Sequence, residues 1–98
     1  MSLAPVTREQ VTEALRAVFD PEMGMSIVDL GLVYRIDVDE HLVRVTMTLT
    51  TPGCPLHEAM AEWVRQAVGR IPGIDGVMVV LTFEPPWTPD RMSRVARL

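Results

Sequence analysis

The only cysteine of the chain, Cys54, lies where an alternating apolar segment gives way to a helical pattern. A strand is expected to end near Thr50, Pro52-Gly53 favours a turn, and Pro55 suits the first position of a helix. Cys54 is therefore expected at the N-cap, where unpaired backbone N–H groups and the helix dipole favour thiolate over thiol. This position predicts a metal-binding or reactive sulfur.

A histidine, His57, follows Cys54 by three residues on the first turn of the same predicted helix. The two side chains could give a metal ion one sulfur and one nitrogen ligand, or form a Cys–His nucleophilic dyad. A structural zinc site needs four protein ligands, and a dyad needs a third group that orients the imidazole. The sequence shows neither the further zinc ligands nor a group that would orient the imidazole. We therefore expect no enzyme, with thiol chemistry at Cys54 as an alternative, and no metal site completed by one chain.

Two carboxylates, Asp20 and Glu22, flank Pro21 directly after the first predicted helix. One interpretation is an ordinary helix-ending turn, because Asp and Pro both favour turns. The other is that these carboxylates converge with Cys54 from across the domain. The residues alone leave both interpretations open.

Composition restricts the class of protein. The 98 residues suit one domain, 1–98, with a single core. The net charge is -4 and the basic residues are scattered, so we expect no nucleic-acid or membrane partner. All nine basic residues are Arg, which excludes a lysine nucleophile. One cysteine cannot form an internal disulfide and the first ten residues do not resemble a signal peptide, so we expect a cytoplasmic protein.

The hydrophobic periodicity predicts a small α/β (α+β) domain. In chain order the predicted elements are a helix at Arg8–Phe19, an extended piece at Ile27–Gly31, a strand at Leu32–Val38, a turn at Asp39–His41, a strand at Val43–Thr50, a helix at Leu56–Val68, a strand at Val77–Phe83 and a short helix from Thr88 to Arg97. The order α-β-β-α-β plus a short C-terminal helix predicts two layers. Two helices should pack on one face of a small mixed sheet of three or four strands.

The last predicted strand raises the question of a partner. Val77–Phe83 is apolar on both faces, so it should be buried on both, either inside the sheet or against another subunit. It is the first place to expect a homodimer contact. Trp87 follows among prolines, and we expect it to cap the edge of the core, with an exposed partner-binding anchor as the alternative.

Four motifs occur in a fixed order along the chain. They are Asp20-Pro21-Glu22, Ser26-Ile27-Val28-Asp29-Leu30-Gly31-Leu32-Val33-Tyr34, Thr50-Thr51-Pro52-Gly53-Cys54-Pro55, and Pro85-Pro86-Trp87 with Met92-Ser93. In this order and spacing the chain resembles the PaaD/SufT-like family (MIP-eighteen-type domain) from about Val11 to Ala96. That family includes bacterial iron-sulfur assembly accessories and factors of the eukaryotic cytosolic pathway.

The resemblance implies a fold similar to the C-terminal domain of NifU scaffolds and a role in maturing or delivering iron-sulfur clusters. It also implies one shallow functional site formed by five residues: Asp20, Glu22, Thr50, Thr51 and Cys54. The chain ends at Leu98 without the cysteine-rich extension of PaaD proper, which argues against a direct role in phenylacetate hydroxylation.

The single thiol limits how a cluster could be held. Iron-sulfur clusters usually take four protein ligands, most often Cys, and this chain has one. A cluster at Cys54 would therefore be transient and shared with a second copy, a small thiol or a client protein.

Together these arguments predict an accessory factor for iron-sulfur cluster assembly or delivery, whose partners are client or assembly proteins. Cys54 would be the ligand or exchange thiol, and His57 is a weaker candidate ligand. The alternative is a protein–protein adaptor whose sulfur binds nothing, including a PaaD-like component of a phenylacetate-degradation complex.

Overall fold

The computed structural model of the chain describes residues 5–50 and 57–92. In chain order it contains α1 (Arg8–Leu15), β1 (Phe19–Asp20), β2 (Met25–Ser26), β3 (Val33–Asp39), β4 (Leu42–Met47), α2 (His57–Gly69), β5 (Gly76–Leu81) and the 3-10 helix η1 (Pro89–Arg91). The order agrees with the prediction, apart from the added two-residue strands β1 and β2. No helix in these two stretches is long and apolar enough to cross a membrane.

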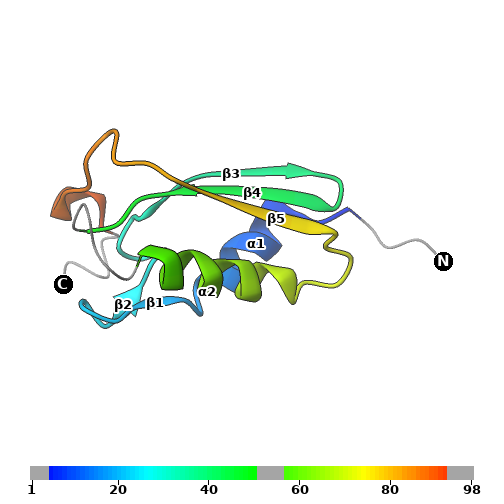
Figure 1. The fold of residues 1–98 in the computed structure, drawn as a ribbon, viewed down its shortest axis with the longest axis horizontal. Helices are drawn as coiled ribbons and strands as arrows, with labels where there is room; N and C mark the ends of the chain where they lie inside the picture. Colours follow the sequence, from blue (N-terminus) through cyan, green and yellow to red (C-terminus); the bar gives the residue numbers. More distant parts are fainter. Residues whose placement is uncertain (1–4, 51–56, 93–98) are drawn as a thin grey trace.

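The main sheet has, within the described residues, three strands in the order β3-β4-β5 (Figure 1). β3 and β4 form an antiparallel hairpin, whereas β4 and β5 are parallel and are connected through α2. The register places Ile36, Val45 and Val79 in one row across the sheet. The sheet is therefore mixed, as predicted.

Both long helices pack on the same face of this sheet, where α1 contacts β3 and α2, and α2 contacts β5 (Figure 1). Thr7 caps α1: its Oγ1 accepts a hydrogen bond from the Gln10 N–H at 3.1 Å, and Gln10 Oε1 accepts one from the Thr7 N–H at 2.8 Å. The helices and the inner face of the sheet share one apolar core that includes Val11, Leu15, Val43, Val45, Met47, Met60, Val64 and Val68. This arrangement confirms the predicted two-layer fold.

The first helix is shorter than predicted. It ends at Leu15 rather than Phe19, and Phe19 is 54% exposed instead of facing the core. The Ile27 N–H donates to the Val18 carbonyl at 2.9 Å, and Phe19 pairs with Ser26 in the β1–β2 hairpin. This pairing requires extended backbone, which a helix through Phe19 would not provide.

The segment Ile27–Gly31 forms turns, so the prediction of an extended piece is wrong. The Leu30 N–H donates to the Ser26 carbonyl at 3.0 Å, and the Gly31 N–H donates to the Val28 carbonyl at 3.1 Å. The Ser26 hydroxyl accepts from the Val28 N–H at 3.2 Å, and Gly31 has a φ of 75°. A serine side chain that bonds its own backbone and a glycine in the left-handed region both favour a turn.

Among the residues that the structure describes, β5 is an edge strand with one exposed face. Met78 is 56% exposed, whereas Val77, Val79 and Leu81 pack partly against the core. The prediction that this strand is buried on both faces inside the sheet is therefore wrong. The other predicted environment, a contact with another subunit, stays a prediction. The faces differ because the helices cover only one side of the sheet.

The C-terminal helix is also shorter than predicted within the described residues. η1 covers only Pro89–Arg91, and Met92 returns to extended backbone with a ψ of 148°. Thr88 precedes η1, but its side chain makes no capping hydrogen bond, so a longer helix lacks part of its usual stabilisation. Residues 93–98, over which the prediction continues, lie outside the described residues.

Candidate functional site

The structure describes one part of the predicted site. Asp20, Glu22 and Thr50 belong to the described residues, whereas Thr51 and Cys54 lie outside them. The carboxylate half of the site can therefore be built from contacts and distances. The cysteine half stays a prediction.

Asp20 holds the turn between β1 and β2. Its Oδ1 accepts hydrogen bonds from the N–H groups of Glu22 at 2.8 Å and Met23 at 3.1 Å. Its carbonyl oxygen accepts from the Gly24 N–H at 2.8 Å, and Gly24 has a φ of 68°. The residue is only 4% exposed. These bonds support the interpretation of Asp20 as the residue that forms the turn.

Glu22 and Thr50 differ from Asp20 in exposure. Glu22 is exposed next to the buried Asp20, so its carboxylate is the solvent-exposed negative charge of this turn. Thr50 is half-buried, directly after the buried Thr48 and Leu49. Thr50 therefore marks the point where the chain leaves the core.

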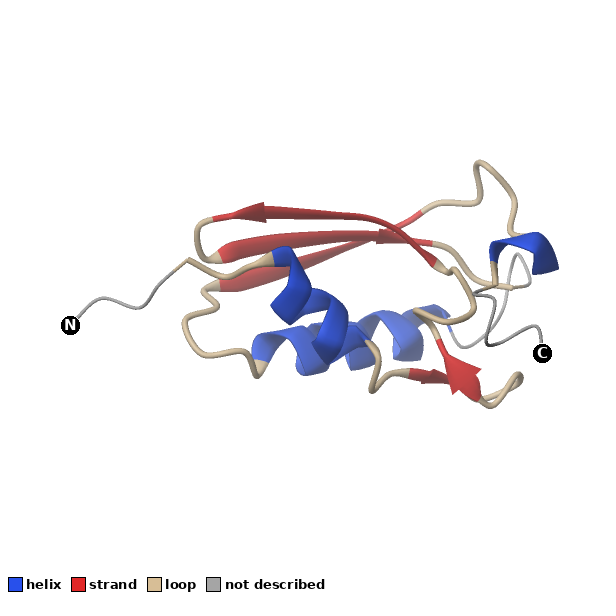
Figure 2. Ribbon diagram, turned by 180° about the vertical axis from the view of Figure 1, so that it is seen from behind, coloured by secondary structure: helices blue, strands red, loops and turns tan. Residues whose placement is uncertain are grey.

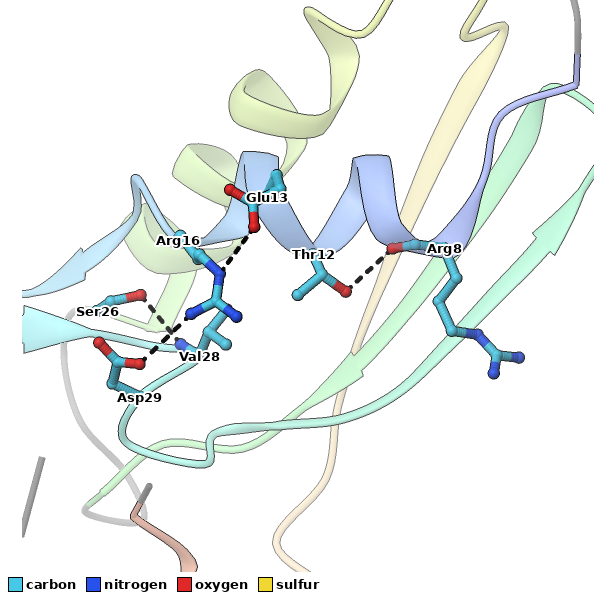
Figure 3. Close-up of polar contacts among 7 residues, drawn as sticks. All are labelled: Arg8, Thr12, Glu13, Arg16, Ser26, Val28 and Asp29. Carbon is cyan, nitrogen blue, oxygen red and sulfur yellow. Dashed lines mark hydrogen bonds and ion pairs between the residues drawn. The ribbon is translucent and has the colours of Figure 1, made fainter. Parts of the chain in front are cut away.

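An arginine connects α1 to the turn that follows β2 (Figure 3). Arg16 Nε lies 3.1 Å from Glu13 Oε1, and Arg16 Nη1 lies 3.6 Å from Asp29 Oδ1. These side chains are well exposed, so each ion pair stabilises the fold by no more than about 1 kcal/mol. The contact places the C-terminal end of α1 beside residues 26–31 without adding much stability.

Residues 85–92, which we call the C-terminal segment, pack against residues 30–34. The Trp87 Nε1–H donates to the Leu30 carbonyl at 2.6 Å, and the Tyr34 hydroxyl donates to the Pro85 carbonyl at 2.8 Å. Trp87 is partly buried against the core. The prediction that Trp87 caps the edge of the core is therefore confirmed.

Arg91 completes the contact between these two segments. Its guanidinium carbon lies 4.7 Å from the centre of the Tyr34 ring, within the range of a cation–π interaction. Its backbone comes so close to Gly31 that a Cβ atom at position 31 would overlap the Arg91 carbonyl group. Sequence reasoning missed this contact. The available signal was Gly31, since a glycine inside an apolar run often marks a close backbone approach.

The β1–β2 hairpin and η1 lie at the same end of the molecule as the start of α2 (Figures 1 and 2). α2 begins with His57, whose side chain lies outside the described part of the structure. The fold therefore brings the Asp20 turn to the end of the domain from which α2 starts. In residues 5–50 and 57–92, no group of three or more His, Cys, Asp and Glu is arranged to hold a metal ion.

The fold defines the class of protein as a small α+β domain. The polar β1–β2 turn and the C-terminal segment lie at the same end of it as the start of α2 (Figures 1 and 2). A family model described as iron-sulfur cluster assembly protein matches residues 8–80. The chain therefore belongs to this family of iron-sulfur cluster assembly proteins.

Two relatives and one solved structure are similar over most of their length. The chain is 46% identical over 93 residues to an Fe-S protein maturation auxiliary factor of Porphyromonas gingivalis, covering 94% of this chain and 89% of the relative. It is 45% identical over 82 residues to the Fe-S protein maturation auxiliary factor SufT of Staphylococcus aureus, covering 83% and 93%. A conserved hypothetical protein of Thermotoga maritima matches with a TM-score of 0.85 and 48% identity, over 99% of this chain and 95% of that one. The SufT-like family and the fold are therefore confirmed.

Proposed function

We propose that this chain is an accessory factor that assembles iron-sulfur clusters or delivers them to client proteins. The observation that carries the proposal is the similarity to two Fe-S protein maturation auxiliary factors, of which the chain spans 89% and 93%. The sole thiol, Cys54, supplies the type of ligand that iron in such clusters prefers.

In this proposal the cluster is cargo that Cys54 holds for a short time. Its thiolate binds one iron, and the remaining ligands come from a second copy, a small thiol or the client. During delivery, a client thiol forms a new bond to this iron while the bond to the Cys54 sulfur breaks. The proton that the client thiol loses is taken up by the Cys54 thiolate, and no electrons are transferred.

The other predicted site residues have different parts in the proposal. Asp20 shapes the β1–β2 turn through its two backbone hydrogen bonds, and the exposed Glu22 is the carboxylate that tunes the site or contacts the client. Thr50 and Thr51 hold the loop that carries Cys54.

Anaerobic reconstitution with ferrous iron and sulfide tests ligation by Cys54. The wild type should develop visible absorbance from iron–sulfur charge transfer, and Cys54→Ser should lose most of it. His57→Ala tests the weaker candidate ligand beside Cys54. In this proposal Cys54 is the only ligand from this chain, so the His57 variant should keep the absorbance. Equal absorbance in the wild type and Cys54→Ser, or none in either, would overturn the role of Cys54 as a cluster ligand.

One observation favours the adaptor as a second candidate function. A groove of about 320 Å³ lies between residues 17–19, which follow α1, and α2, and its lining includes the exposed Phe19 and Trp63 together with Arg70. Aromatic and Arg side chains dominate the binding energy of many protein interfaces. A pure adaptor would lose client capture in Trp63→Ala and keep full client maturation in Cys54→Ser. A cluster factor would lose client maturation in Cys54→Ser.

We also propose that the chain works in the cytoplasm, as a single domain and without catalysis of its own. A reducing compartment keeps a lone thiol free for ligand exchange. The two relatives are named auxiliary factors, which supports a role beside the assembly machinery.

A further inference from the structure

One edge of β5 is available for a contact that is separate from cluster chemistry. β5 pairs with β4 on one side, and no strand within the described residues pairs with its other side. A strand at the edge of a sheet presents a row of unpaired N–H and C=O groups to the next strand that meets it. The type of partner that fits this edge is therefore another strand, whose backbone can form hydrogen bonds with these groups.

The two edges of the sheet differ in how they are protected. β3 carries charged side chains on its outer positions, and Arg35 and Asp37 form an ion pair of 2.8 Å. β5 contains only Gly, Val, Met and Leu, with no charge and no proline. Charges, prolines and bulges are the usual means of preventing edge-to-edge pairing, so β5 lacks the protection that β3 has.

The space beside β5 suits the side chains of an added strand. A groove of about 590 Å³ runs between β5 and α2, and its lining residues are Glu58, Ala61, Glu62, Arg65, Val79 and Leu81. Alternate side chains of an added strand would enter this groove. The others would extend the exposed face that Met78 and Val80 form on β5.

We propose that the occupant is a second copy of this chain. The two β5 strands pair antiparallel across a two-fold axis, so that two three-stranded sheets become one continuous sheet. The same axis sets the two α2 helices side by side and antiparallel. Glu62 and Arg65 both line the groove side of α2 and form a 2.9 Å pair within the chain. Glu62 and Arg65 flank the middle of α2 (His57–Gly69), so an axis that passes beside this point would place each Glu62 near the Arg65 of the other copy. This surface is then complementary to itself in charge.

The size of the edge indicates a weak dimer. β5 has 6 residues and α2 has 13, so each is about 20 Å long. The helix layer and the sheet layer are each about 10 Å thick, so the edge is about 20 Å wide. A strip of about 20 Å by 20 Å offers roughly 400 Å² per copy, about half of what a standard stable interface buries. The dimer should therefore form at high concentration and dissociate on dilution.

Sedimentation velocity of the whole chain, from about 1 µM to about 500 µM, tests the dimer in the range expected for small interfaces. The sedimentation coefficient of the wild type should rise with concentration. Met78→Lys puts one positive charge per copy beside the axis and should raise the dimer Kd at least about tenfold. Leu42→Lys is the matched control, because Leu42 is 54% exposed on the same face but lies on the central strand β4. It should change the Kd less than about twofold.

Two further measurements locate the contact. Glu62→Arg and Arg65→Glu should each dimerise less than the wild type alone, and an equal mixture of the two variants should recover the dimer. Amide hydrogen exchange of β5 in the wild type should slow as concentration rises, which needs no variant. A chain that stays monomeric with unchanged exchange would overturn the proposal and leave this edge to a strand of another protein. Equal effects of Met78→Lys and Leu42→Lys, or no recovery in the mixture, would also overturn it.

Discussion

Two regions of this domain are held together in different ways. In the two-layer body, apolar side chains such as Leu15 and Val45 are completely buried between the helices and the sheet. At the end that carries the β1–β2 turn, single polar contacts such as those of Asp20 and Trp87 add to apolar burial. Burial stabilises the whole domain, whereas such contacts fix local structure. Substitutions in the body should therefore unfold the protein, and those at this end should act locally.

The largest effect should come from the body. Leu15→Ala removes a fully buried side chain from α1 and should lower the free energy of unfolding by about 3 kcal/mol. Leu42→Ala makes the same change at a 54% exposed position and should cost less than about 1 kcal/mol. Urea denaturation of both variants checks this difference. Equal losses would show that burial does not separate the two positions.

A smaller effect is expected where the C-terminal segment meets residues 30–34. Gly31→Ala would place a Cβ against the Arg91 carbonyl at a φ of 75°, and should cost about 2 kcal/mol or detach residues 85–92. Gly24→Ala has a similar φ of 68° but nothing within 4 Å of its Cβ, so it should cost only about 1 kcal/mol. Denaturation and limited proteolysis measure both outcomes. If Gly31→Ala costs no more than Gly24→Ala, the close approach does not hold the segment.

The smallest effect should come from the β1–β2 turn. Asp20→Ala removes the acceptor of two backbone N–H groups and should cost about 1 kcal/mol, with the fold retained. Asp20→Asn keeps an oxygen at this position, so it should cost clearly less. Thermal unfolding compares the two variants. A cost for Asp20→Asn equal to that of Asp20→Ala would mean that the charge, and not hydrogen bonding, stabilises the turn.

The body was the more predictable region because one-sided burial imposes a period on the sequence. α2 and β4 follow the helical and alternating patterns closely, since each presents one face to the same core. The end of α1 could not be predicted in this way. Its helical pattern continues to Phe19, and only pairing with Ser26 makes that residue extended. For β5, the apolar sequence did not reveal that its outer face is exposed in the part of the chain that the structure describes.

The candidate site also contains one part that the sequence predicts and one part that it does not. The turn at Asp20 follows from local chemistry, because Asp before Pro favours a turn whose backbone it can bond. The contacts of Trp87 with Leu30 and of Arg91 with Gly31 join segments about sixty residues apart in the sequence, and no local sequence pattern specifies such pairings. Trp87 was predicted to cap the edge of the core, but its partner Leu30 was not, and for the contact of Arg91 the only trace in the sequence was Gly31.

Transfer of a cluster from this chain to an apo iron-sulfur enzyme tests the role of Cys54 most directly. The chain is loaded anaerobically, mixed with the apoenzyme, and the rate at which enzyme activity returns is compared with that for iron and sulfide alone. The wild type should restore activity faster than the free ions, and Cys54→Ser should restore it no faster than they do. A Cys54→Ser variant that transfers clusters as fast as the wild type would contradict the proposed function of this thiol.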